Sequence, residues 1–229
     1  MESRIIITKF QTTDGVIIVS DFVQPNGAKK VALLLHMMPE TRSSWTSLSA
    51  ELNKDGLATL AIDLRGHGES TRQSAVNSQQ SETENKMDYK KFSDQEHQAS
   101  RLDVDAAMNF LKSKGFAEKN ILVAGASIGA NLVVDAMYRY KEISRGVLLS
   151  PGLDYRGVKT ESAMKGLEAA QKVWIIAAEN DEYSADSTKT LAKLRPEIAK
   201  STIYSGSDHG TYLFKSQKTL IADIVKFLQ

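Results

Sequence analysis

The chain contains no cysteine among its 229 residues, which excludes disulfide bonds, thiolate catalysis and cysteine-based metal sites. It also has little excess charge of either sign, since 29 Lys and Arg residues balance 28 Asp and Glu residues and leave a net charge of +1. This balance offers no general basis for binding nucleic acid or an anionic membrane surface. We therefore expect neither as a partner.

Long apolar runs are missing as well. The longest, at about residues 31–35, falls far short of the roughly 20 apolar residues that span a bilayer. The N-terminal residues lack the basic start, the apolar run and the small-residue cleavage site of a signal peptide. These absences lead us to expect a cytoplasmic location.

What is present is an ordinary globular composition, with 41% hydrophobic and 25% charged residues. Short apolar runs alternate with longer helical patterns, and most of the runs are continuous, as in strands that are covered on both faces. Strands are predicted at 5–10, 16–22, 31–36, 58–62, 121–124, 146–149, 173–177 and 202–204. Helices are predicted at 45–54, 99–114, 128–140, 191–200 and 219–228.

This order of elements predicts an α/β fold in a single domain, residues 1–229. Strand and helix alternate from residue 31 onward, which predicts a mostly parallel eight-stranded sheet with helices on both faces. The first two strands, joined by a turn-like stretch at 12–15, add an antiparallel hairpin at one edge. Residues 71–95 are polar, rich in Ser, Gln, Glu and Lys, and without a sustained period, so we expect a long surface insertion.

A G-x-S-x-G motif occupies Gly125 to Gly129, with Ser127 at its centre. The pattern by itself is weak, but here it lies between a predicted strand and a predicted helix. That is the strand-to-helix turn on which a nucleophilic serine is presented, and the glycines permit the sharp turn. Ser127 is therefore the candidate nucleophile.

A serine hydroxyl needs a base and an acid to orient that base. His209 follows the last predicted strand, so it shares the sheet edge of Ser127. Asp181 follows the strand at 173–177 and is the favoured acid. Asp154 follows the preceding strand and stays open as an alternative. Two further acids also remain possible, and they are Glu179 and Glu182.

In this order of serine, acid and histidine the chain resembles the α/β-hydrolase family. Two further stretches are similar to that family. The stretch from His36 to Pro39, after a strand, stands where the family has a His-Gly oxyanion loop, and the stretch from Asp63 to Ser70 looks like its D-x-R-G-x-G-x-S segment. The resemblance extends over roughly residues 16–229.

The resemblance implies that the backbone N–H groups of Met38 and Ile128 form an oxyanion hole. It also implies that His36 and His67 shape the loops rather than react. One residue departs from the family pattern, because Met37 stands where the family usually has glycine. Its side chain either packs inward or crowds the acyl site. The residue of this loop that donates its N–H to the oxyanion is therefore either Met38 or Met37. Like a small esterase, the chain lacks room for a large helical cap.

Together these features favour a serine hydrolase that cleaves small carboxylic esters through an acyl-enzyme, with no metal or organic cofactor. An apolar rim of Met37, Met38 and Ile128 suits esters better than phosphates, sugars or long lipids. Thioesters, lactones and amides stay open as substrates of the same triad, as does a non-catalytic small-molecule receptor. Residues 71–95 are a candidate cover that tunes substrate size, or a scaffold surface. The natural substrate and the oligomeric state stay open.

Overall fold

The computed structural model describes residues 4–74 and 85–229. In this part of the chain ten strands form one sheet and two more form a separate hairpin. The strands are β1 (Ile6–Gln11), β2 (Val16–Val23), β3 (Val31–Leu35), β4 (Ala58–Ile62), β5 (Arg72–Gln73), β6 (Asn85–Lys86), β7 (Ile121–Ala126), β8 (Arg145–Leu149), β9 (Asp154–Tyr155), β10 (Val158–Lys159), β11 (Lys172–Ala178) and β12 (Ala199–Tyr204). The helices are α1 (Thr46–Lys54), α2 (Asp94–Gln98), α3 (Arg101–Ser113), α4 (Ile128–Arg139), α5 (Glu161–Lys165), α6 (Glu182–Leu194), α7 (Leu213–Ser216) and α8 (Leu220–Leu228).

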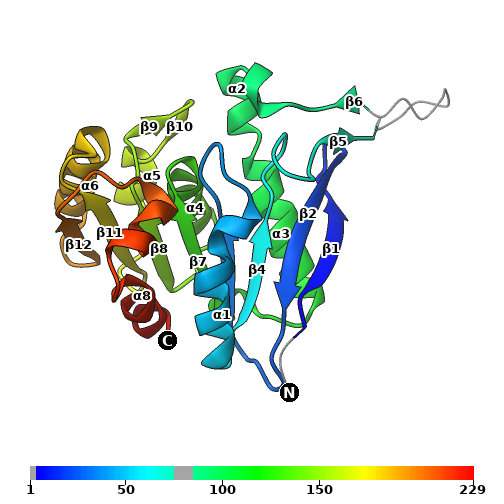
Figure 1. Cartoon of the computed structure of the whole chain (residues 1–229), viewed down its shortest axis with the longest axis horizontal. Helices are drawn as coiled ribbons and strands as arrows, with labels where there is room; N and C mark the ends of the chain where they lie inside the picture. The colour runs from blue at the N-terminus through cyan, green and yellow to red at the C-terminus, as the bar shows by residue number, and fades with distance from the viewer. Residues whose placement is uncertain (1–3, 75–84) are drawn as a thin grey trace.

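Neighbouring strands pair in the order β12-β11-β8-β7-β3-β4-β2-β5-β6, and β1 pairs with β2 (Figure 1). The six strands from β12 to β4 in this order are parallel. The pairs β1–β2, β2–β4 and β2–β5 are antiparallel. The predicted mostly parallel sheet with an N-terminal antiparallel hairpin is confirmed.

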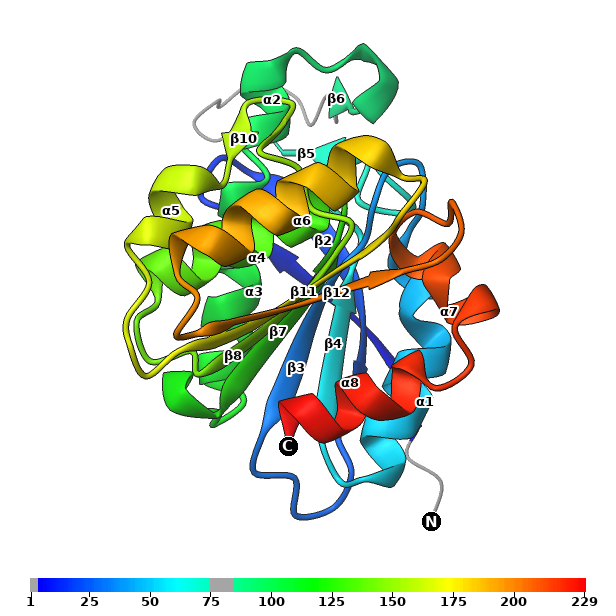
Figure 2. The same cartoon turned by 90° about the vertical axis from the view of Figure 1, so that its left-hand side faces the viewer.

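Helices cover both faces because successive side chains along a buried strand point to opposite sides. On β3, for example, Leu33 and Leu35 join the core beneath α3, α4, α5 and α6, whereas Leu34 joins the core beneath α1, α7 and α8. Figure 2 shows these two helical layers on either side of the sheet. Within the described stretches, none of the helices is both long enough and apolar enough to cross a bilayer.

The predicted helix at 191–200 is wrong. Helix α6 begins at Glu182 and ends at Leu194, and the chain after it turns into β12. Pro196 is the physical reason, because a proline disfavours helical backbone at the residue before it and lacks an N–H to continue the helix. Arg195 accordingly has an extended φ of −145°.

The sheet also has two strands more than the eight predicted. These strands, β5 and β6, are each two residues long and precede and follow residues 75–84 in the sequence of the insertion. Strand β5 pairs with the start of β2 and with β6, so the insertion extends the sheet edge. Residues 75–84 of the insertion lie outside the described residues.

Candidate functional site

Ser127 is the single residue between β7 and α4. Its backbone has φ 53° and ψ −121°, a conformation that non-glycine residues rarely adopt. A Cβ on Gly125 would collide with the carbonyl of Gly129, and a Cβ on Gly129 would collide with the carbonyl of Leu35. Both glycines of the motif are therefore required by close backbone contacts. They hold Ser127 in a turn that is sparsely populated and typical of functional sites.

The structure brings His209 and Asp181 together. Each lies on a loop that follows a parallel strand, β12 and β11 respectively, at the sheet edge that also carries Ser127. The Nδ1 atom of His209 lies 2.7 Å from Oδ2 of Asp181. Burial alone would raise the pKa of Asp181, but hydrogen bonds from His209, Ser184 and Ser150 outweigh it and lower the pKa. Asp181 is therefore an anion that holds one ring nitrogen of His209.

The other candidate acids do not reach His209. Asp154 is exposed on β9, and its Oδ1 accepts a hydrogen bond from the Gly157 amide at 2.7 Å. The side chains of Glu179 and Glu182 are exposed to solvent.

Two serines that the sequence reading missed support this pair. Ser150 has φ 50°, and its Oγ accepts a hydrogen bond from the Gly210 amide at 2.9 Å, which ties the histidine loop to the loop after β8. Ser184, on the first turn of α6, is fully buried and contributes to the low pKa of Asp181. Ser150 precedes a Pro-Gly pair at a strand end, which is the only sequence signal for it.

The loop after β3 packs on the start of α4. The backbone oxygens of Leu35 and His36 lie against Gly129, so the next residues, Met37 and Met38, lie beside the first turn of that helix. The first amides of a helix have no partner within the helix, which leaves the Ile128 N–H available to an incoming oxyanion. The loop after β3 and the first turn of α4 are therefore neighbours.

Met37 packs inward. Its side chain is 1% exposed, and its sulfur contacts Gly210, the neighbour of His209. Ile128 is buried as well, so the expected apolar rim of Met37, Met38 and Ile128 is wrong for two of its three residues. Met38 is partly exposed. The side chains of Met37 and Ile128, in contrast, fill the cores on opposite faces of the sheet.

His36 and His67 are buried next to each other, with ring centroids 4.9 Å apart. The Nε2 atom of His36 accepts a hydrogen bond from the Leu64 amide at 2.9 Å, and its Nδ1 lies 2.8 Å from the Met37 carbonyl, which fixes a neutral ring protonated at Nδ1. Burial lowers the pKa of His36 to about 4. Neither ring contacts the Asp181–His209 pair through any hydrogen bond found in the described residues.

The described end of the insertion is anchored on the segment from Asp63 to Ser70. The Tyr89 ring stacks on His67 at a centroid distance of 3.9 Å, and Phe92 packs against Gly66. Tyr89 and Phe92 thus attach the insertion to this segment.

Tyr155, which the sequence reading also missed, lies beside His209. The hairpin β9–β10 carries it, and the Tyr155 and His209 ring centroids are 6.3 Å apart with the rings at 89°. Figure 1 shows this hairpin at the same end of the sheet as α2. A two-residue strand has no periodic pattern that a sequence reading could find.

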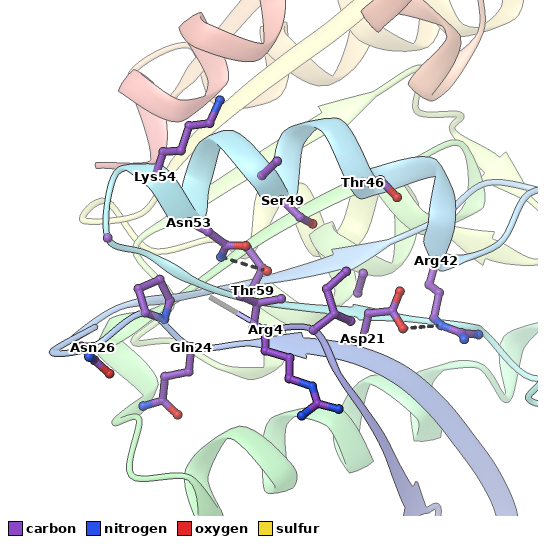
Figure 3. A pocket seen from close by; sticks show the side chains of 16 residues that line it. Arg4, Asp21, Gln24, Asn26, Arg42, Thr46, Ser49, Asn53, Lys54 and Thr59 are labelled. Atoms are coloured by element: carbon purple, nitrogen blue, oxygen red, sulfur yellow. Dashed lines mark hydrogen bonds and ion pairs between the residues drawn. The ribbon is translucent and has the colours of Figure 1, made fainter. Parts of the chain in front are cut away.

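A pocket of about 990 Å³ lies elsewhere, between α1 and the strands β2 and β4 (Figure 3). Two pairs of its polar residues bond each other: Arg42 pairs with Asp21 at 2.8 Å, and the Asn53 amide donates to Thr59 at 3.2 Å. Ser127, Asp181 and His209 are not part of its lining. No cluster of three or more His, Asp or Glu side chains in the described residues is placed to hold a metal ion.

Comparisons with known proteins give the family and the fold of the chain. Residues 26–195 match the model of the family described as serine aminopeptidase, S33. No curated protein sequence matches the chain.

Among solved structures, an esterase from Pyrococcus furiosus is 17% identical, with a TM-score of 0.76 over 99% of this chain and 92% of that one. A dienelactone hydrolase from Anabaena variabilis is 16% identical, with a TM-score of 0.72 over 99% and 95% of the two chains. A thioesterase domain from the curacin biosynthetic pathway is 12% identical, with a TM-score of 0.68 over 96% and 99%. At these identities the likeness concerns the fold alone.

Proposed function

Because this chain belongs to the S33 serine aminopeptidase family of α/β-hydrolases, we propose that it is a serine hydrolase acting on small carboxylic esters. The observation that carries the proposal is the 2.7 Å contact between His209 and Asp181, on the sheet edge where the strained Ser127 turn lies. A hydroxyl on such a turn beside a carboxylate-oriented imidazole is the arrangement that serine hydrolases use.

In the proposed mechanism the Ser127 oxygen attacks the ester carbonyl carbon while its proton passes to Nε2 of His209. Asp181 accepts the Nδ1–H of His209, keeps the ring in the correct tautomer and stabilises the imidazolium. The N–H groups of Met38 and Ile128 bind the oxyanion of the tetrahedral intermediate. When the intermediate collapses, His209 returns the proton to the leaving alcohol, and an acyl-enzyme remains on Ser127.

Water completes the cycle. His209 takes a proton from a water molecule as its oxygen attacks the acyl carbon, and the second intermediate expels Ser127 with that proton. The products are one alcohol and one carboxylic acid, and each residue returns to its starting state. None of these steps requires a metal or an organic cofactor.

Small esters are the proposed substrates because the chain between β8 and β11 holds only the short hairpin β9–β10 and helix α5 rather than a large cap. Amides are a second candidate, since the family description names aminopeptidases. A panel of p-nitrophenyl esters and aminoacyl p-nitroanilides measures the preference directly.

The test is a fluorophosphonate probe together with the variant Ser127→Ala. We expect the wild-type protein to be labelled at Ser127 and to lose labelling when unfolded. Ser127→Ala should keep its fold by circular dichroism and lower ester turnover by about 10³-fold or more. A folded wild-type protein that neither reacts with the probe nor turns over an ester would favour a non-catalytic receptor on the same fold.

A further inference from the structure

The Tyr155 ring is held in place from several sides. Its hydroxyl lies 2.9 Å from the Oγ of Ser184, and its ring packs edge-on against Tyr183 at a centroid distance of 5.5 Å. A Cβ added to Gly152 would collide with the same ring. An aromatic ring with a bonded hydroxyl and packed faces is a fixed wall rather than a mobile side chain.

The hydroxyl also connects the ring to the proposed triad. The Ser184 hydroxyl donates a hydrogen bond to the Ser150 carbonyl at 3.5 Å, and it also helps to lower the pKa of the Asp181 carboxylate. The Ser184 oxygen is then free to accept the proton of Tyr155. Burial raises the pKa of the Tyr155 phenol, and contacts of the phenol with the side chains of Ser184 and Ser127 oppose that rise. The phenol is therefore partly buried and bonded to Ser184.

The position of the ring identifies the part of the substrate that it faces. His209 must deliver a proton to the leaving oxygen, so the alcohol part of an ester lies beside the His209 ring. Tyr155 stands edge-on to that ring at a centroid distance of 6.3 Å, and the Ser127 side chain is near enough to lower the pKa of its phenol. The oxyanion donors come from the loop after β3 and from α4, whereas Tyr155 comes from the hairpin after β8. The ring thus borders the leaving-group side of the reaction centre.

Resting on the proposed role of Ser127 and His209, we propose that Tyr155 determines specificity for the alcohol part of the ester. Its ring closes the leaving-group side and selects small alcohols. The hydroxyl anchors the ring through Ser184, and the ring supplies the wall. The acyl part lies away from Tyr155 and is selected by other residues.

The experiment compares two series of esters, one with a fixed acetyl group and methyl, butyl or benzyl alcohols, and one with a fixed alcohol and acyl groups of increasing length. Tyr155→Ala should raise kcat/KM for benzyl relative to methyl acetate by about tenfold or more, since differences of a few methylenes in a pocket are worth that much. The acyl-length ratio should change by less than about threefold. Tyr155→Val is a second truncation in case the alanine variant is unstable.

Two controls keep the outcomes apart. Tyr155→Phe retains the ring and should retain the wild-type alcohol ratio, and Tyr138→Ala removes an exposed tyrosine on α4 and should change neither ratio. An unchanged alcohol ratio in both truncations, or a shift of the acyl ratio instead, would overturn the assignment of Tyr155. A wrong proposed function would be recognised by different results: the wild-type protein would not be labelled at Ser127, or Ser127→Ala would turn over esters at the wild-type rate.

Discussion

Gly129 shows how strictly single residues are constrained around Ser127. The atoms that a side chain at this position would meet belong to the backbone of Leu35 and His36, which cannot rotate away. Gly146 differs, because an added Cβ there would meet the flexible side chain of Met137. Alanine substitutions at the two glycines can therefore be compared to test how rigidly the turn at Ser127 is packed.

We expect Gly129→Ala to lower the free energy of unfolding by about 2–3 kcal/mol, and Gly146→Ala by about 1 kcal/mol, because overpacking against rigid atoms costs more. Urea denaturation followed by circular dichroism measures both values. Equal losses in the two variants would show that the backbone of the loop after β3 yields as easily as a methionine side chain.

The two acids Asp181 and Asp154 differ in their contacts, and this difference gives a prediction on activity. Asp181→Asn should leave the fold intact and lower kcat by about 10²–10⁴-fold, because His209 loses control of its tautomer. Asp154→Asn should cost about tenfold or less, since the Asp154 carboxylate bonds the Gly157 amide of its own hairpin. Steady-state kinetics on one ester measure both, and a larger loss in Asp154→Asn would reverse the assignment.

Sequence reasoning could propose Ser127, Asp181 and His209 because their signals are local: a glycine spacing and two loops that follow apolar strands. Ser150, Ser184 and Tyr155 carry no such signal. They reach the site only because the parallel pairing of β8 with β11 aligns their loops at one edge. Contacts of this kind depend on tertiary structure, which a single sequence does not show.

At the scale of elements, the buried strands were predictable and α6 was not. The strands are continuous apolar runs, and each predicted run is a strand in the structure. The buried face of α6 consists mainly of small and hydroxylated residues, which do not read as an apolar stripe. Its true stripe begins with Ser184, whose burial is explained by hydrogen bonds at the site and not by hydrophobicity.

The hairpin β9–β10 has a two-residue turn, Arg156 and Gly157, with φ values of 53° and 79°. Positive φ at both positions is typical of a type I′ turn, which favours Asn-Gly. We expect Arg156→Asn to raise the free energy of unfolding by about 0.5 kcal/mol and Arg156→Val to lower it by about 1 kcal/mol. Thermal unfolding should rank the variants asparagine, wild type, valine, and any other order contradicts the assigned turn.

At the scale of the whole molecule, buried charges and imidazoles decide how stability depends on pH. Burial lowers the pKa of His36 to about 4, and burial together with the nearby His36 lowers the pKa of His67 to about 3. Since an unfolded histidine has a pKa of about 6.5, the unfolded chain binds these protons more readily than the folded protein does. Their contribution to stability is thus complete above about pH 6.5 and is lost as the pH falls toward 4.

One pKa unit corresponds to roughly 1.4 kcal/mol. The shifted pKa of His36 therefore lowers the free energy of unfolding by on the order of 3 kcal/mol as the pH falls through this range. Asp103 acts in the opposite direction, because burial raises its pKa to about 6 against the effect of Arg65.

A single variant tests the contribution of His67. His67→Phe keeps the stacking on Tyr89, and we expect a shallower fall in the free energy of unfolding between pH 6.5 and 4 than in the wild type. Urea denaturation at several pH values measures the slopes, and identical slopes would exclude His67 as a source of acid sensitivity.

The pairing of β5 with β6 has a consequence for how this protein can diverge. Gln73 lies opposite Asn85, so the chain leaves the sheet and returns to it at neighbouring points. Lengthening a loop whose ends already meet costs only about 0.6 kcal/mol for each doubling of its length. We therefore expect insertions and deletions between β5 and β6 to be tolerated, because the paired strands can keep their register.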